Sequence, residues 1–353
     1  MNRKIVNIQA LRGVAALMVL VAHLHHYEGE HGAHVPGGMF WVLGNAGVDL
    51  FFVISGFVMV TVSSGRFGRE REAPRFLIRR AARIYPLYWC FSLVILPLYL
   101  LRPGMVNAGG GNQKIILWRS FLLYPQQAPP LIAQGWTLSH ELYFYLVFAC
   151  LLMLSESWLL PLCVLWGALV SFGSVKLDMS IPTINVIANP LTLEFIAGCF
   201  IAVAARRGLP RWGLPILLGG SALLVIGGLH TTELGTAWQR DLYFGIPAVL
   251  IVLGSVAMES RGSTAPRWLI VSGDASYSLY LSQGLILAAI ARTAWKVLPA
   301  GIGSNAIILA AMAIAAVIGG FCCYFLLELP LIGMTKKLLA RKKERAAPVP
   351  AST

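Results

Sequence analysis

The stretch IQALRGVAALMVLVAHLHHYEG, residues 8–29, decides the fold. Its apolar run is long enough for a membrane-crossing helix, because about 20 apolar residues span ~30 Å of hydrocarbon. The pattern extends to the whole chain: of 353 residues, 57% are hydrophobic and only 12% are charged, and the mean hydropathy is +0.72. A soluble domain carries about 25% charged residues. The sequence therefore predicts an all-α integral membrane protein.

Apolar runs of this kind recur evenly along the chain, which predicts one polytopic bundle of about ten transmembrane helices. The expected spans lie at residues 6–27, 40–63, 84–101, 136–154, 158–175, 187–205, 213–229, 242–258, 276–295 and 304–327. A shorter apolar segment at 115–124 is expected to be interfacial or re-entrant. We expect a single membrane domain over residues 1–335, followed by a basic, disordered cytoplasmic tail over 336–353.

The positions of the basic residues predict the orientation of the bundle. The net charge is +13, and with ten spans the basic clusters all fall on one side. These clusters are Arg3/Lys4, the seven arginines between 66 and 83, Arg206/Arg207/Arg211, Arg261/Arg267 and the six Lys/Arg between 336 and 345. Lys and Arg mark the cytoplasmic side, so both termini are predicted to be cytoplasmic. Because this charge borders membrane spans, it favours membrane lipids over nucleic acid as its partner.

The six cysteines all lie within apolar runs and show no metal-ligand spacing. We therefore expect neither a disulfide framework nor a metal site. The first apolar segment follows a basic start, as a signal peptide would, but it is long and lacks a small-residue cleavage site. It is interpreted as an uncleaved span.

Arg12 and His23 are expected on one face of the first helix. They are eleven residues apart, which at 100° per residue returns to within about 20° of the same face, ~16 Å deeper in the membrane. Ionisable groups inside a membrane normally face the bundle interior or a water-filled cavity. Two other interpretations stay open: Arg12 reaches cytoplasmic headgroups, or His23 joins His25 and His26 in an interfacial polar cluster.

Three acidic residues enter other spans from the outer side: Asp49, Glu141 and Glu194. With His23 they place four ionisable groups in the outer half of the membrane, each costly to bury. A histidine with a carboxylate partner is a standard general-base arrangement. Glu141 is the predicted partner of His23 on grounds of depth. A structural hydrogen-bonding role is the alternative for each single acid.

The segment APRFLIRRAARIYPLYW, residues 73–89, is predicted to be a cytoplasmic helix with an arginine face. Arg75, Arg79 and Arg83 recur at i, i+4 and i+8 and share that face, and Arg80 adds a fourth charge. One interpretation is an amphipathic helix on anionic lipid. The other is a phosphate clamp, since arginine forks suit phosphates, and its size suits coenzyme A.

Several motifs together resemble those of the acyltransferase-3 family of integral membrane O-acyltransferases, especially its short bacterial members that modify exopolysaccharide or lipopolysaccharide sugars. The resemblance extends to about residue 335 and keeps the family's order of motifs. The pieces are LRGVAALMVLVAH, GVDLFFVISGF, RRAARIYPLYW, GWTLSHELYFY, EFIAG, SYSLYLSQ and ELP.

This resemblance implies transfer of an acyl group, usually acetyl, from cytoplasmic acyl-CoA to a hydroxyl of a glycan or glycolipid, in the bacterial inner membrane. Arg12 and His23 match the family's essential pair, and Arg79, Arg80 and Arg83 match its CoA-side segment. The residues expected to be catalytic are His23, Arg12, Glu141 and Asp49. Those expected to bind substrate are Arg75, Arg79, Arg80, Arg83, Glu194, Trp136 and Tyr143.

Two positions depart from the family pattern. Gln283 stands where the family usually has a histidine, so no proton transfer is assigned there, and His140 replaces an apolar residue beside Glu141. No permanently bound cofactor is expected, because acyl-CoA is a substrate. Direct transfer and an acyl-histidine intermediate both remain open.

Two other classes of function are weighed against the acyltransferase. A sugar or organic-acid transporter or flippase would also carry ionisable groups on several helices, but it would not need the cytoplasmic arginine cluster. A non-catalytic partner of polysaccharide assembly machinery would not need Arg12, His23, Asp49 and Glu141 together. The acyltransferase hypothesis is preferred, and association with such machinery is compatible with it.

Overall fold

Each of the ten predicted spans coincides with a helix, which confirms an all-α bundle. The structure is a computed structural model that describes residues 5–30, 38–106, 114–230, 236–297 and 301–345, and it contains no strand in these ranges. The ten helices are α1 (Val6–Glu30), α3 (Ala46–Ser63), α4 (Glu72–Leu101), α7 (Gly135–Leu152), α8 (Leu159–Lys176), α10 (Leu191–Arg207), α11 (Gly213–His230), α13 (Ile246–Glu259), α15 (Ser276–Val297) and α16 (Ile302–Cys323).

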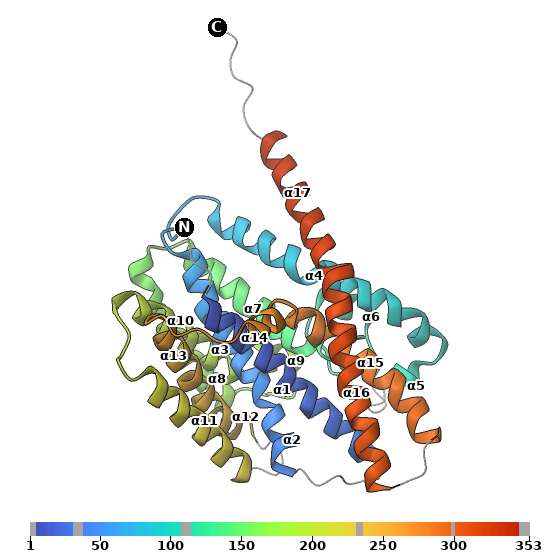
Figure 1. The fold of residues 1–353 in the computed structure, drawn as a ribbon. Helices are drawn as coiled ribbons and strands as arrows, with labels where there is room; N and C mark the ends of the chain where they lie inside the picture. The colour runs from blue at the N-terminus through green and yellow to red at the C-terminus, as the bar shows by residue number, and fades with distance from the viewer. Residues whose placement is uncertain (1–4, 31–37, 107–113, 231–235, 298–300, 346–353) are drawn as a thin grey trace.

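Shorter elements extend or connect these helices (Figure 1). They are α2 (Gly38–Gly44), α5 (Pro103–Val106), α6 (Leu117–Leu122), η1 (Glu156–Trp158), α9 (Pro182–Ile187), α12 (Ala237–Arg240), η2 (Asp241–Gly245), α14 (Arg267–Asp274), η3 (Tyr324–Glu328) and α17 (Leu329–Arg345). The short α6 lies within the apolar segment expected to be interfacial or re-entrant. Of η1 to η3, the first is a 3₁₀ turn and the others are π-helical.

Eight helices in the described part of the chain are long and apolar enough to cross a membrane. The two further long helices, α7 and α15, coincide with the fourth and ninth predicted spans. Polar and charged side chains lower their apolarity: α7 carries His140 and Glu141, and α15 carries Gln283 and Arg292. The chain is therefore a multi-pass membrane protein, and ten crossings remains a prediction.

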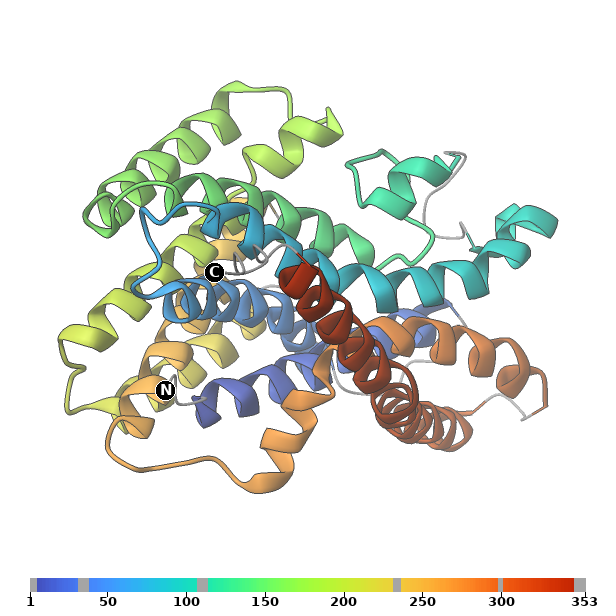
Figure 2. The same ribbon diagram turned by 90° about the horizontal axis from the view of Figure 1, so that it is seen from above.

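Burial separates the interior helices from those at the edge. The apolar windows of the spans that contain α3 and α10 are both 72% buried, whereas those of α8 and α11 are only 28% and 22% buried. From above, α1 and α3 lie in the middle of the bundle, with α8 toward its outside (Figure 2). The apolar outer faces of α8 and α11 suit contact with lipid.

Close backbone contact holds α3 against α10. A Cβ atom added at Gly56 would lie 1.9 Å from the carbonyl oxygen of Phe195, and one added at Gly198 would lie 2.0 Å from that of Val53. Only glycine fits at these two positions. Small residues commonly allow such close approach between membrane helices.

Contacts between distant segments place the basic loops at one end of the bundle. The main-chain N–H groups of Val6 and Asn7 donate to the Glu259 carboxylate at 2.7 and 2.6 Å, which joins the start of α1 to the end of α13. Arg206 at the end of α10 pairs with Glu156 and also donates to the carbonyl of Val60 at 2.9 Å. The basic segments joined by these contacts therefore lie on one side, as predicted, while Arg3 and Lys4 lie outside the described residues.

The arginine segment and the third span form one continuous helix. α4 contains 30 residues, which corresponds to ~45 Å and exceeds the ~30 Å hydrocarbon thickness. The turns at one of its ends therefore project beyond the hydrocarbon when the rest spans it. Pro86 and Pro97 lie inside this helix.

The C-terminal tail differs from the expectation of disorder. α17 continues to Arg345, so residues 336–345 are helical. Their composition explains the difference, because Lys, Leu, Ala, Arg and Glu are all good helix formers. Residues 346–353 lie outside the described ranges. α17 projects from the bundle at the end where α4 begins (Figure 1).

Candidate active site

Five helices surround a cavity of about 300 Å³. Most of its wall is apolar, with residues such as Ile8, Phe51 and Met59. Its polar lining comes from α1, α3, α4, α7 and α15. These polar residues are Gln9, Arg12, Ser55, Thr61, Arg80, Arg83, Thr137, Glu141, Tyr145, Ser276, Tyr277 and Tyr280. Five of the family-like motifs thus meet at one cavity, although they are far apart in sequence.

Arg12 is held in this cavity by its own helix. Its Nη1 donates to Oε1 of Gln9, one turn earlier, at 3.3 Å, and Gln9 in turn donates to Asp274 at 2.8 Å. Arg83 and Glu141 are close enough to interact electrostatically with the Arg12 guanidinium. Arg12 therefore lies inside the bundle, as predicted from sequence.

Glu141 belongs to the Arg12 end of the site. Its carboxylate accepts hydrogen bonds from Tyr145 and, at 3.4 Å, from Ser55 on α3. No hydrogen bond joins Glu141 to His23, both of which the structure describes, so the predicted pairing is wrong. His23 lies ~16 Å further along α1 than Arg12, whereas Glu141 reaches inward from α7 to the depth of Arg12.

The arginines of α4 divide between the cavity and the surface. Arg80 and Arg83 line the cavity. Arg75 and Arg79, with side chains 55% and 43% exposed, instead pair with Glu72 at 3.0 and 3.4 Å. The predicted shared face of Arg75, Arg79 and Arg83 is therefore split. The face toward the cavity carries Arg80, which sequence spacing treated only as an added charge.

Arg80 presents an unsatisfied donor at the cavity. Its guanidinium lies over the rings of Phe76 and Tyr145, 5.3 and 5.6 Å from their centroids. Its Nε is buried and has no hydrogen-bond partner in the described ranges. A buried unpaired donor is costly, so this position suits an anionic ligand. Arg83, an exposed residue that also lines the cavity, places a second positive charge at its mouth.

His23 lies outside the residues that line this cavity. Its Nδ1 is buried without a hydrogen-bond partner in the part of the chain described. α1 and α15 run in the same direction. Gln9 near the start of α1 bonds Asp274, two residues before α15 begins, and further along both helices Tyr27 donates to the carbonyl of Gly284 at 3.4 Å. His23 is thus at about the depth of Gln283, whose buried amide is also unpartnered among the described residues.

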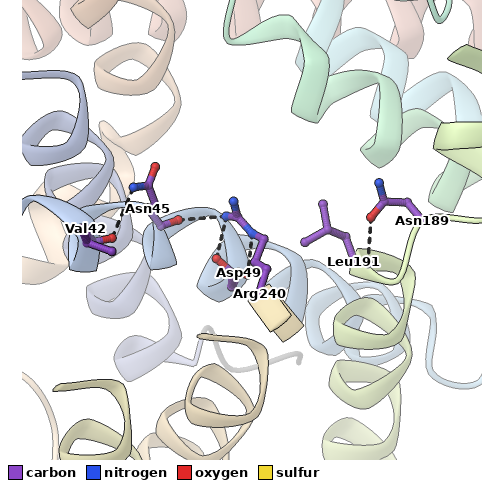
Figure 3. Close-up of polar contacts among 6 residues, drawn as sticks. All are labelled: Val42, Asn45, Asp49, Asn189, Leu191 and Arg240. Carbon is purple, nitrogen blue, oxygen red and sulfur yellow. Dashed lines mark hydrogen bonds and ion pairs between the residues drawn. The ribbon is translucent and has the colours of Figure 1, made fainter. Parts of the chain in front are cut away.

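Asp49 forms a two-point ion pair that the sequence did not reveal. Nε of Arg240 lies 2.9 Å from Oδ1 of Asp49, and Nη2 lies 2.7 Å from Oδ2 (Figure 3). Nη2 also donates to the carbonyl of Asn45 at 3.0 Å. Asp49 is fully buried. These contacts favour the structural alternative for Asp49, and they anchor α12 against the start of α3.

Glu194 lies near this ion pair and does not line the cavity. Both oxygens of its carboxylate are buried, and neither has a hydrogen-bond partner of good geometry among the described residues. The carboxylate lies within electrostatic range of Asp49, Arg240 and Asp241. Asn189 accepts the N–H of Leu191 at 3.1 Å where α10 begins (Figure 3). The four ionisable groups assigned to the outer half of the membrane therefore do not meet at one site: Asp49 and Glu194 form one cluster, Glu141 joins Arg12, and His23 lies apart from both.

Trp136 and Tyr143 lie on a different face of α7 from Glu141. Trp136 is 41% exposed and contacts His140 edge-on, with ring centroids 5.8 Å apart. The Tyr143 hydroxyl accepts a hydrogen bond from Nε1 of Trp166 at 3.1 Å. Neither lines this cavity, whose aromatic lining residues are others.

The aromatic residues that line the cavity come from α3, α7 and α15, and they include two tyrosines of the motif SYSLYLSQ, Tyr277 and Tyr280. The Tyr277 hydroxyl donates to the carbonyl of Ile84 at 2.7 Å, and the Tyr280 hydroxyl lies 2.6 Å from that of Thr137. Near the start of α15, Ser278 donates through its N–H and hydroxyl to Glu328 at 3.2 and 2.6 Å. The ELP motif thus supports the base of α15.

The fold and the cavity define a class of protein: a helical membrane protein whose interior presents arginines in a cavity with a mostly apolar wall. Residues 5–326 match the acyltransferase-3 family model, described as an acyltransferase domain. The chain belongs to this family and is an integral membrane O-acyltransferase, which confirms the resemblance of its motifs. No solved structure matches it.

Curated relatives are similar over nearly their full lengths. The chain is 34% identical to the exopolysaccharide production protein ExoZ of Rhizobium meliloti, covering 90% of this chain and 99% of the relative. It is 24% identical to the acyltransferase MdmB of Streptomyces mycarofaciens, covering 98% and 95%. Its identity to nodulation protein 10 of Rhizobium leguminosarum is 25%, covering 82% and 84%.

Proposed function

We propose that this protein transfers an acyl group, most simply acetyl, from cytoplasmic acyl-CoA to a hydroxyl of a surface glycan or its lipid-linked precursor in the bacterial inner membrane. The observation that carries the proposal is the cavity with Arg12, Arg80 and Arg83 at the end of the bundle where the basic loops gather. Similarity to an exopolysaccharide production protein supports a polysaccharide acceptor.

The donor fits the cavity in two parts. The nucleotide of CoA carries a diphosphate and a phosphate monoester, and arginine forks bind such groups well. Arg83 at the mouth and Arg80 further in would hold these phosphates. The pantetheine arm and acyl group are less polar and match the apolar wall formed by residues such as Ile8 and Phe51. A volume of about 300 Å³ suits the arm rather than the whole molecule.

His23, which lies beyond the residues that line this cavity, would act as general base on its outer side. Its imidazole takes the proton of the acceptor hydroxyl while that oxygen attacks the thioester carbonyl carbon. The carbon–sulfur bond then breaks, the acyl group stays on the acceptor oxygen, and the proton passes to the leaving CoA thiolate. The unpartnered Nδ1 of His23 supports this assignment. Arg12, ~16 Å from His23 along α1, would hold the donor arm or its phosphates rather than contact the reacting carbonyl group.

Glu141 would then stabilise Arg12 and would not pair with His23. Its carboxylate lies close enough to stabilise the Arg12 guanidinium, and its bonds to Tyr145 and Ser55 fix its position. Removing Glu141 is therefore expected to impair donor placement as well as turnover.

The test is transfer of labelled acetyl from acetyl-CoA to glycan by purified protein in lipid nanodiscs. We expect the parent protein to acetylate the surface polysaccharide of its own cell. His23→Ala should abolish transfer while acetyl-CoA still binds. His25→Ala is the matched control, because His25 lies on the same helix, is 47% exposed and pairs with Glu28. Near-normal turnover by His23→Ala would rule out His23 as the base.

A further inference from the structure

A second cavity of about 450 Å³ lies where the segment before α7 meets the segment before α9. Helix α7 separates it from the first cavity. Trp136, Ser139 and His140 line the second cavity, whereas Thr137 and Glu141 line the first. This division follows from helix geometry, since residues three and four apart share a face. One helix therefore contributes to both cavities.

The second cavity lies at the end of the bundle away from the basic loops. It borders the start of α7, whereas the end of α7 is near the α3–α4 loop, because Gly68 donates to the carbonyl of Leu152 at 3.0 Å. That loop carries the cytoplasmic arginines. By the predicted orientation, the second cavity opens on the outer side of the membrane.

Hydrogen bonds fix the two segments that form its walls. Nε2 of Gln127 donates to the carbonyl of Ser180 at 2.7 Å, which ties the walls together. Nδ2 of Asn185 donates to the carbonyl of Met179 at 3.2 Å. Gln126 accepts the N–H of Ile116 at 3.0 Å through Oε1. Pro125, Pro129, Pro130 and Pro182 also line the cavity and restrict its backbone. The cavity is therefore held open by the protein itself.

The lining chemistry favours a neutral ligand, although the Arg119 guanidinium lies behind the cavity wall, over the ring of Tyr124. Within the described chain, no Asp, Glu, Lys or Arg lines this cavity, in contrast to the three arginines of the first. Its surface combines two aromatic side chains, Trp136 and Tyr124, 41% and 45% exposed, with amides and hydroxyls. Aromatic faces beside hydrogen-bonding groups suit a neutral ligand that has both C–H faces and many hydroxyls.

His140 adds an unsatisfied group at the boundary of the cavity. The residue is only 4% exposed, and its Nδ1 is buried without a hydrogen-bond partner in the described ranges. Its ring packs against Phe52, Trp136 and Phe144. Buried polar groups normally have partners, so this imidazole is available to a ligand hydroxyl after a small rearrangement.

We propose that the second cavity is a carbohydrate subsite that holds a neutral sugar of the acceptor glycan, with Trp136 as its stacking platform. The proposal rests on the proposed acyltransferase function and adds where the acceptor is held. The proposal also accounts for the polar side chains on two different faces of α7, since one face would contact the acyl donor and the other the acceptor.

The test measures binding of neutral oligosaccharides, prepared by partial hydrolysis of the cell's own surface polysaccharide, to the full protein in nanodiscs by calorimetry. We expect Trp136→Ala to weaken binding at least fivefold and to raise the acceptor KM similarly, while acetyl-CoA affinity is unchanged. Trp136→Phe should recover most of the loss because it keeps an aromatic face. Trp158→Ala is the control, since Trp158 is exposed and lies in η1, at the other end of the bundle.

Equal oligosaccharide affinity in Trp136→Ala and the parent would overturn the subsite, even if acetyl transfer by the parent is robust. Loss of binding in Trp136→Ala together with weakened acetyl-CoA binding or a lowered unfolding temperature would also overturn it, since the effect would then be global. Failure of the parent to transfer acetyl from acetyl-CoA would instead count against the proposed function and would leave the binding comparison intact.

Discussion

Replacing Arg80 and Arg83 together by Gln should weaken binding of acyl-CoA far more than replacing Arg75 and Arg79. Both double variants remove two positive charges from the same helix, so their effect on membrane orientation is matched. Only the first pair lines the cavity, whereas the second pair contacts Glu72. The comparison therefore isolates the position of the charges.

The expected magnitude follows from the surroundings of each arginine. A hydrogen bond between charged groups contributes about 1.5–3 kcal/mol, so two contacts give at least ~3 kcal/mol, or about 100-fold in affinity. Arg83 is exposed, and solvent screens its contact. We therefore take tenfold as the minimum loss for Arg80→Gln/Arg83→Gln and less than threefold for Arg75→Gln/Arg79→Gln.

The assay is equilibrium binding of acetyl-CoA to purified protein in nanodiscs at two salt concentrations. Higher salt should weaken binding to the parent and affect the Arg80/Arg83 variant less, because the lost contacts are ionic. Equal affinities for the two double variants, with both correctly folded, would refute the placement of CoA phosphates at Arg80 and Arg83. The arginines of α4 would then be assigned to lipid headgroups.

Further predictions concern stability: the close contact between α3 and α10, and the ion pair between Asp49 and Arg240. Gly198→Ala should destabilise the protein by about 1–3 kcal/mol through overpacking against Val53, while Gly219→Ala, with no atom within 4 Å, should not lower the unfolding temperature in detergent. Asp49→Asn should cost about 3–5 kcal/mol by leaving Arg240 buried and unpaired. Adding Arg240→Gln should recover part of that loss in a double-mutant cycle, whereas strict additivity of the two unfolding free energies would contradict a structural pair.

The sequence predicted those parts of the fold that depend on local pattern. Apolar runs predicted the ten long helices because each span must bury about 20 residues in lipid. The eleven-residue spacing predicted that Arg12 and His23 share a face of the first helix, and the cost of ionisable groups in the membrane favoured an interior position for Arg12. The arginine helix over 73–89 and the span over 84–101 were expected as separate elements, and their union in one continuous helix, α4, was not predicted.

Pairings between helices were not predictable in the same way. Depth placed Glu141 near His23, but depth does not reveal the direction in which a side chain points around its helix. Arg240 stood alone in an outer loop, and nothing in the sequence indicated that it would pair with Asp49, 191 positions away. The choice of Arg80 over Arg79 depends on the rotation of α4 in the bundle, which packing determines.

Sidedness tests the central claim most directly: that donor and acceptor approach the active site from opposite faces of the membrane. The measurement uses sealed vesicles of known orientation, with acetyl-CoA supplied on the side of the arginine loops and acceptor glycan held on the other side. We expect acetylated glycan to accumulate without passage of free CoA across the membrane. Transfer that occurs only when both substrates share the arginine-loop side would contradict a trans-bilayer reaction.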